Sequence, residues 1–278
     1  MISQGKLKHK INIISIQKNI PHGILYQNFF FERFLERLSL TKYKNMFVLK
    51  GGYLISYMLG VEDRTTVDVD LTVRNYNVNE ESLRMAVQEI LDITLEDNTS
   101  FVITNVTDIR HEDKYNGYRF TIIGTFYSIK FHIKLDVSTG DIITPYAQEK
   151  QIHLYMSETD ITLMSYNTET VLAEKIETIL SRAEASTRLK DYYDIFSILV
   201  KDLGNINIDD LKLAIQNTFI HRNSQNILDN ATKILEQIKK SDILKERWEK
   251  YREDNPYVGK IAYNEVMTKL DLLVGLVF

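Results

Sequence analysis

The sequence contains no cysteine, and among its 278 residues it has only three prolines and six histidines. The absence of cysteine excludes disulfide bonds, thiolate catalysis and cysteine-based zinc sites. The histidines lack the spacing typical of metal ligands, so we interpret them as structural or exposed. Because no low-complexity linker separates the parts of the chain, we expect these parts to share an interface.

Long hydrophobic runs are also missing. No segment approaches the ~20 apolar residues of a membrane span. The positively charged amino terminus continues into residues 11–17, which are too few and too polar for the core of a signal peptide. The apolar run at residues 272–278 is short, and we expect it to dock on the core or on a partner. These features favour a cytoplasmic protein that does not insert into a membrane.

The net charge is −4, from 34 basic and 38 acidic residues. Proteins that coat nucleic acid usually carry a basic excess, so this balance argues against a generally nucleic-acid-binding surface. Basic residues do gather locally, within residues 42–50 and 175–190, and a local groove for an RNA end therefore stays open. With 44% hydrophobic residues, the chain can bury one or two cores without cross-links.

Hydrophobic periodicity divides the chain into an alternating part and a helical part. Residues 1–43 form a leader with an amphipathic helix at 24–38, and residues 44–165 alternate with period two around one helix at 80–91. Strands are predicted at 46–49, 67–73, 101–110, 118–126 and 129–137. From residue 166 to 278 the periodicity is helical, with helices predicted at 168–181, 189–200, 208–219, 227–239, 242–252 and 262–273. This order predicts an α+β fold in which a mixed sheet precedes a helical bundle.

A glycine pair follows the first predicted strand. The apolar residues 46–49 lead into Lys50-Gly51-Gly52, and residues 53–59 have a helical pattern. A strand that turns into a helix through glycine offers backbone N–H groups to phosphate. Lys50 and the later Arg64 are candidate counter-charges for that phosphate. The alternative is an ordinary turn in which glycine only relieves backbone strain.

Two aspartates, Asp68 and Asp70, alternate with apolar residues in the next strand. Alternation of Val67, Val69 and Leu71 with the two acids predicts that the apolar side chains are buried and that both carboxylates share the other face. Their mutual repulsion is costly unless a cation lies between them, and hard divalent cations prefer oxygen ligands. A solvated strand face is the alternative interpretation.

A third carboxylate is expected for two-metal phosphoryl transfer, and Asp136 is the candidate. In residues 129–137 the odd positions are apolar, which places Asp136 on the polar face with Lys134 and His132. Lys134 is predicted to hold a phosphate or to pair with Asp136, and His132 to be a spectator. The alternative is an acid that caps the end of an edge strand.

Charged residues also stand out on two of the predicted helices. Lys175 lies off the apolar stripe of helix 168–181, and Arg182 follows it two turns later on the same face. Asp191 and Asp194 share a face of helix 189–200, so Asp191 is predicted to face Lys175 or Arg182. Binding of a triphosphate or an RNA backbone, a solvated basic face and structural ion pairing all stay open.

These motifs together resemble the AbiEii/AbiGii toxin family of DNA polymerase beta-like nucleotidyltransferases. The resemblance spans about residues 47–199 and rests on the order of its motifs, which are Lys50-Gly51-Gly52, Arg64-Thr65-x-x-Asp68-x-Asp70, Lys134-x-Asp136, Ala173-Glu174-Lys175 and Lys190-Asp191-x-x-Asp194. Many relatives have Gly-Ser at the first turn, whereas this chain has Gly51-Gly52 and lacks that hydroxyl. The resemblance implies that Lys175 and Asp191 belong to the active site.

The resemblance further implies a nucleotidyltransferase toxin of a toxin–antitoxin or abortive phage infection system. Mg²⁺, or alternatively Mn²⁺, held by Asp68, Asp70 and Asp136 is the expected cofactor, and an NTP is the expected substrate. The expected partners are a tRNA acceptor end and a cognate antitoxin protein. Two other functions stay open: transfer of a nucleotide to a protein or small molecule, and nucleotide binding without turnover.

Overall fold

The computed structural model describes residues 3–60, 64–74, 79–110 and 116–277. The chain forms two compact units, each with its own core. The sheet unit comprises residues 1–141 and 148–165, and the helical unit comprises residues 142–147 and 166–278. In the described part of the chain no helix is long and apolar enough to cross a membrane.

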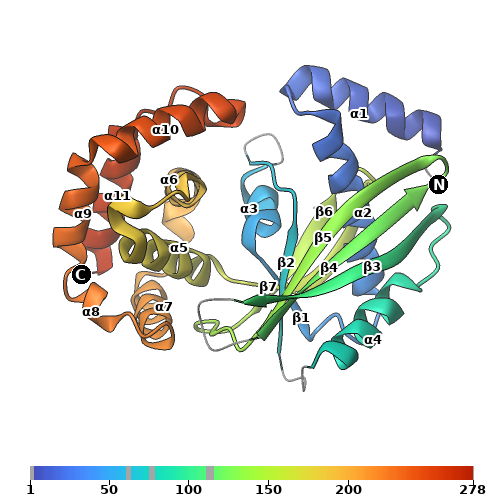
Figure 1. Cartoon of the computed structure of the whole chain (residues 1–278), viewed down its shortest axis with the longest axis horizontal. Coiled ribbons are helices and arrows are strands. Elements are labelled where there is room, and N and C mark those ends of the chain that lie inside the picture. Colours follow the sequence, from blue (N-terminus) through green and yellow to red (C-terminus); the bar gives the residue numbers. More distant parts are fainter. Residues whose placement is uncertain (1–2, 61–63, 75–78, 111–115, 278) are drawn as a thin grey trace. The chain divides into compact units, whose positions relative to one another are not determined.

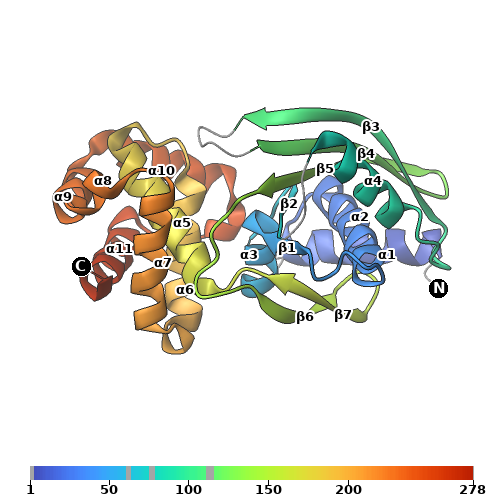
Figure 2. The same cartoon turned by 90° about the horizontal axis from the view of Figure 1, so that it is seen from below.

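The sheet unit contains a seven-stranded mixed sheet with the strand order β3-β4-β5-β2-β1-β7-β6 (Figures 1 and 2). The central strand β2 pairs antiparallel with β1 and parallel with β5. The strands are β1 (Phe47–Lys50), β2 (Val69–Val73), β3 (Thr99–Arg110), β4 (Asn116–Phe126), β5 (Ile129–Thr139), β6 (Gln148–Leu154) and β7 (Thr159–Ser165). The predicted α+β class with a mixed sheet is confirmed.

Strands β6 and β7 were not predicted from the sequence. Each has only two buried apolar positions that alternate with polar ones, Ile152 and Leu154 in β6 and Ile161 and Leu163 in β7. A pattern this short does not distinguish a strand from a polar loop. Pairing of β7 with β1 extends the sheet beyond the strand that leads into the glycine pair.

Among the described residues of the sheet unit, four helices accompany the sheet: α1 (Gln4–Lys18), α2 (His22–Ser39), α3 (Gly51–Leu59) and α4 (Glu80–Leu91). Helix α2 covers one sheet face with phenylalanines: Phe30 packs on Phe101 and Phe131, and Phe29 packs on Phe126. Gly124 lies directly under α2, because a Cβ there would be 2.4 Å from the Phe30 ring. The opposite face is left for the polar residues of β5. Helix α1 was not predicted.

The helical unit contains α5 (Thr168–Arg182), α6 (Leu189–Asp202), α7 (Ile208–His221), α8 (Gln225–Leu228), α9 (Ala231–Lys240), α10 (Asp242–Asp254) and α11 (Tyr263–Val277) (Figure 1). Helix α5 follows an N-cap at Asn167, whose side chain accepts a hydrogen bond from the Thr170 N–H at 2.7 Å. Its predicted apolar stripe is buried. In the apolar run at residues 272–278, Leu273 and Val274 are buried in the core, Leu272 is 38% exposed, and residue 278 lies outside the described residues.

Candidate active site

A single row of charged residues crosses the four strands β1, β2, β5 and β4. Lys50 is the register partner of Asp70, Asp70 is that of Asp136, and Asp136 is that of Arg119. Side chains that are opposite each other on neighbouring strands lie on the same face of the sheet. The row therefore has a cation at each end and two adjacent carboxylates in its middle.

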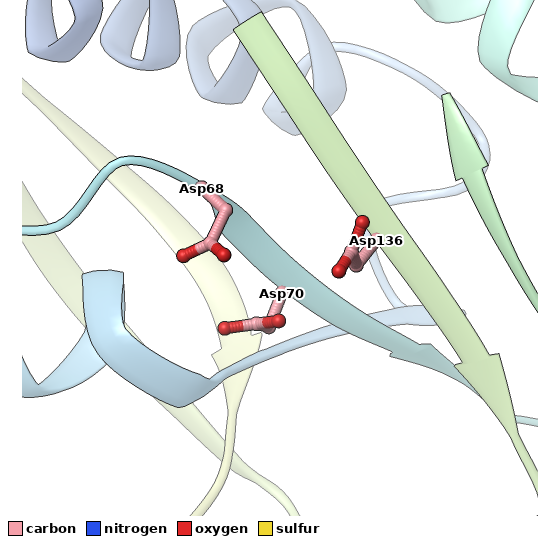
Figure 3. A group of neighbouring side chains, drawn as sticks. All are labelled: Asp68, Asp70 and Asp136. Atoms are coloured by element: carbon pink, nitrogen blue, oxygen red, sulfur yellow. The ribbon is translucent and has the colours of Figure 1, made fainter. Parts of the chain in front are cut away.

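Asp68 completes a cluster of three carboxylates. One oxygen from each of Asp68, Asp70 and Asp136 lies within 4.8 Å of the others, and Figure 3 shows the three side chains converging. The predicted burial of Val67 is wrong, because its side chain is 51% exposed and strand β2 begins only at Val69. Asp68 nevertheless keeps its carboxylate beside Asp70, and the Thr66 hydroxyl donates a hydrogen bond to it at 3.1 Å.

The repulsion expected between these acids is visible at Asp70. Burial, followed by the charge of Asp68, raises the pKa of Asp70 to about 6, although Lys50 and a hydrogen bond from Gly52 act in the opposite direction. Beside the three carboxylates of the cluster, Lys50 forms an ion pair with a further acid, Asp141, and Arg119 forms one with Asp136. A divalent cation would supply the missing positive charge.

Gly51 and Gly52 allow the β1–α3 turn to approach the carboxylates. The predicted helix starts two residues earlier than expected, at Gly51, whose φ of +65° favours glycine. A Cβ on Gly51 would lie 1.9 Å from Oδ2 of Asp70, and one on Gly52 would lie 2.6 Å from Oγ1 of Thr66. The Gly52 N–H donates to Oδ2 of Asp70 at 3.3 Å. The turn is thus fitted to the Asp70 carboxylate.

The cations near the turn have defined contacts. The Lys50 ammonium forms an ion pair with Asp141, a residue that sequence reasoning missed. The Ser138 hydroxyl also donates to Asp141, at 2.7 Å. Burial would raise the pKa of Asp141, but the charge and hydrogen bond of Lys50 outweigh it and lower this pKa to about 2. Nη2 of Arg64 lies 3.7 Å from the position of a Gly52 Cβ, beside the turn.

Arg119 is the second residue that sequence reasoning missed. Its Nε and Nη2 donate to the two oxygens of Asp136 at 2.7 and 2.6 Å, so Arg119 takes the place that was predicted for Lys134 in an ion pair. Lys134 lies exposed on the same sheet face. The sequence does contain a signal for this contact. Only Tyr127 and Ser128 separate β4 from β5, and so short a hairpin connection fixes a register in which Arg119 is opposite Asp136.

The helical unit holds the remaining predicted site residues. Lys175 on α5 donates to Asp191 at 2.7 Å and to Asp194 at 2.6 Å, both on α6, and Arg188 donates to the second oxygen of Asp191 at 2.8 Å. Asp191 therefore faces Lys175, as predicted. Arg182 is exposed at the end of α5, whereas the Lys175 side chain is only 13% exposed. The predicted shared basic face is wrong, because α6 covers Lys175.

Opposite charges are well matched in this second cluster. Burial would raise the pKa of Asp191, but Lys175 and Arg188 outweigh it and lower this pKa to about 2. Burial would likewise lower the pKa of Lys175, but the two aspartates outweigh it and raise this pKa. Lys175 is thus held as a cation.

The donors of the carboxylate cluster fit a hard divalent cation. Asp136 lies on β5, Asp70 lies on the adjacent strand β2, and Asp68 directly precedes β2. Each contributes one carboxylate oxygen to the group. Mg²⁺ is typically bound by one or two carboxylates together with substrate phosphates and water. Burial and, after it, like-charged neighbours raise the pKa of Asp70, and a cation bound among these donors would stabilise its ionised form.

Comparison with known proteins supports the same conclusion. The family model described as nucleotidyl transferase AbiEii toxin, type IV TA system, matches residues 33–269. No curated protein matches the sequence. A candidate nucleotidyltransferase of known structure from H. pylori is similar over 92% of this chain and 96% of its own, with 12% identity and a TM-score of 0.51, which shows a common fold. JHP933 from Helicobacter pylori is 13% identical over 90% of this chain and 92% of its own, with a TM-score of 0.48.

Proposed function

The chain belongs to the AbiEii family of nucleotidyl transferase toxins of type IV toxin–antitoxin systems, and from this membership we propose that it transfers a nucleotide from an NTP to the 3′ end of tRNA. The observation that carries the proposal is the convergence of Asp68, Asp70 and Asp136 beside a glycine turn. A solvated strand face does not require three carboxylates within 4.8 Å of one another.

In the proposed reaction an acceptor hydroxyl attacks the α-phosphorus of the NTP. The bond between the α-phosphorus and the bridging oxygen breaks, pyrophosphate leaves, and the hydroxyl proton passes to solvent. Asp68, Asp70 and Asp136 would hold Mg²⁺ or Mn²⁺, which when bound neutralises phosphate charge and lowers the pKa of the acceptor hydroxyl.

The other residues of the sheet unit have roles toward the triphosphate in this proposal. The Gly51 and Gly52 turn and the Arg64 guanidinium beside it bind the β- and γ-phosphates, and Lys50 supplies a further positive charge. Lys134 binds a phosphate from the exposed face of β5. In the helical unit, Lys175, Asp191 and Arg182 fix the nucleotide or the acceptor, a role that rests on the family resemblance.

Family membership also supports a protein partner. A type IV toxin is encoded with an antitoxin, so we propose that a cognate antitoxin opposes this protein in the cytoplasm. Phage defence through abortive infection is the proposed context.

The test is a labelling experiment with the purified protein. The protein is incubated with Mg²⁺, one α-labelled NTP at a time and total tRNA, beside the Asp70→Asn variant and the exposed control Asp108→Asn. We expect label in RNA with the wild type and Asp108→Asn, and a rate that is roughly 100–1000-fold lower with Asp70→Asn. Label in protein would favour a protein-modifying enzyme, and NTP binding without label would favour a non-catalytic regulator. Full activity of Asp70→Asn would contradict the site assignment.

A further inference from the structure

Arg119 makes a two-point contact with the third carboxylate of the cluster. Its Nε donates to Oδ1 of Asp136 at 2.7 Å and its Nη2 donates to Oδ2 at 2.6 Å. The Arg119 side chain is 38% exposed and that of Asp136 is 14% exposed, so Asp136 is the more buried of the two partners. Such a paired geometry fixes the plane of a carboxylate as well as its position.

The contact leaves Asp136 able to bind a cation. An ionised carboxylate has about four acceptor sites, and a guanidinium that donates once to each oxygen uses two of them. One Asp136 oxygen still lies within 4.8 Å of oxygens of Asp68 and Asp70. The remaining acceptor sites of Asp136 are therefore available to the cluster while Arg119 is in place.

Asp136 needs a stabilising contact to stay close to Asp68 and Asp70, because the three carboxylates have the same charge. One oxygen of Asp136 lies within 4.8 Å of oxygens of Asp68 and Asp70, and carboxylates this close repel one another. Without a partner, the Asp136 side chain would lower its energy by turning away from Asp70. The β4–β5 register places Arg119 directly opposite Asp136, and that position is fixed by backbone pairing.

We propose that Arg119 is a positioning residue of the metal site, which holds Asp136 toward Asp68 and Asp70 before a divalent cation binds. The inference rests on the proposed function, in which these three acids are the metal ligands. A positioning role and a simple count of charges predict opposite changes in cation affinity when Arg119 is replaced. Removal of a nearby positive charge alone would strengthen cation binding, whereas loss of a group that orients a ligand typically weakens it 10–100-fold.

The test is Mn²⁺ binding to the metal-free full-length protein, measured by titration calorimetry. The variants are Arg119→Gln, Arg119→Lys and the control Arg84→Gln, which changes an exposed arginine on α4. We expect binding to be roughly 10–100-fold weaker for Arg119→Gln, intermediate for Arg119→Lys, which keeps the charge but not the two-point contact, and unchanged for Arg84→Gln.

Equal or tighter Mn²⁺ binding by Arg119→Gln would overturn the inference. If that variant does not fold, judged by circular dichroism, then wild-type affinity of Arg119→Lys would overturn it. A second readout is the metal concentration that gives half-maximal transfer, which should rise while the rate at saturating metal stays close to that of wild type. Wild-type labelling of RNA combined with unchanged Mn²⁺ affinity of the variants would refute the role of Arg119 and leave the proposed function intact.

Discussion

The two units each contain a cluster of aspartates, and the clusters differ in how completely their charges are matched. In the helical unit, Asp191 and Asp194 share Lys175, and Arg188 adds a second cation. In the sheet unit, Asp68, Asp70 and Asp136 converge with Arg119 in contact with Asp136. The pKa of Asp191 is lowered to about 2, whereas that of Asp70 is raised to about 6.

The difference indicates that the aspartates of the helical unit stabilise the fold, whereas those of the sheet unit are suited to bind a cation. A buried carboxylate with its own cations is stabilised in its ionised form by the protein alone. A buried carboxylate whose neighbours have the same charge gains that stabilisation only when a cation binds. The helical cluster therefore connects α5 with α6, and its predicted part in catalysis must be separated experimentally from this structural one.

The largest expected effect on stability comes from removing the lysine of the helical unit's cluster. Lys175→Met removes the cation that the buried Asp191 and Asp194 share, although Arg188 still contacts Asp191. Loss of one partner of a buried pair costs about 3–5 kcal/mol. Urea unfolding followed by circular dichroism measures the free energy of unfolding. Lys233→Met, at an exposed lysine of α9, is the control. A cost below about 1 kcal/mol for Lys175→Met would show that the cluster contributes little to the fold.

In the carboxylate cluster of the sheet unit, by contrast, removal of a charge should increase the free energy of unfolding. Asp70→Asn removes a charge that is destabilised by burial and by Asp68, and the asparagine oxygen can still accept from Gly52. In metal-free protein at pH 8 we expect the free energy of unfolding to rise by about 1–3 kcal/mol, since one pKa unit corresponds to about 1.4 kcal/mol. Thermal melts with a chelator measure this, and destabilisation of Asp70→Asn would contradict the account.

The smallest effect concerns pH. Because the folded-state pKa of Asp191 lies below its ordinary value of 3.8, its ion pairs stabilise the protein above pH ~4, and this contribution is lost as the pH falls toward about 2. Between pH 5 and pH 2.5 the wild type should lose about 1.5 kcal/mol more than Asp191→Asn. Unfolding curves at the two pH values test the difference. Identical pH dependence of the two proteins would show that Asp191 is not stabilised as an anion.

The sequence contains much of this site but not all of it. Period-two alternation predicts strand β5 and the polar face that carries Asp136, because that pattern comes directly from the geometry of a strand. The short β4–β5 connection could also have revealed Arg119. Asp141 was not predictable, because it follows Gly140, whose φ of 82° redirects the chain in a way that no local pattern encodes.

The helical cluster illustrates a second limit of sequence reasoning. Helical spacing places Asp191 and Asp194 on one face of α6, and this prediction is confirmed by their shared contact with Lys175. The expected basic face of Lys175 and Arg182 fails because helical spacing does not say which neighbouring helix covers a side chain. Burial of Lys175 by α6 depends on tertiary packing, which periodicity alone does not determine.

The most direct test of the central claim is a Mn²⁺ titration that compares Asp70→Asn with Asp191→Asn, both checked for native circular dichroism. The account predicts that the unmatched cluster is the metal site, so Asp70→Asn should lose high-affinity Mn²⁺ binding and Asp191→Asn should retain it. Retention of wild-type binding by Asp70→Asn, or its loss in a folded Asp191→Asn protein, would contradict the account.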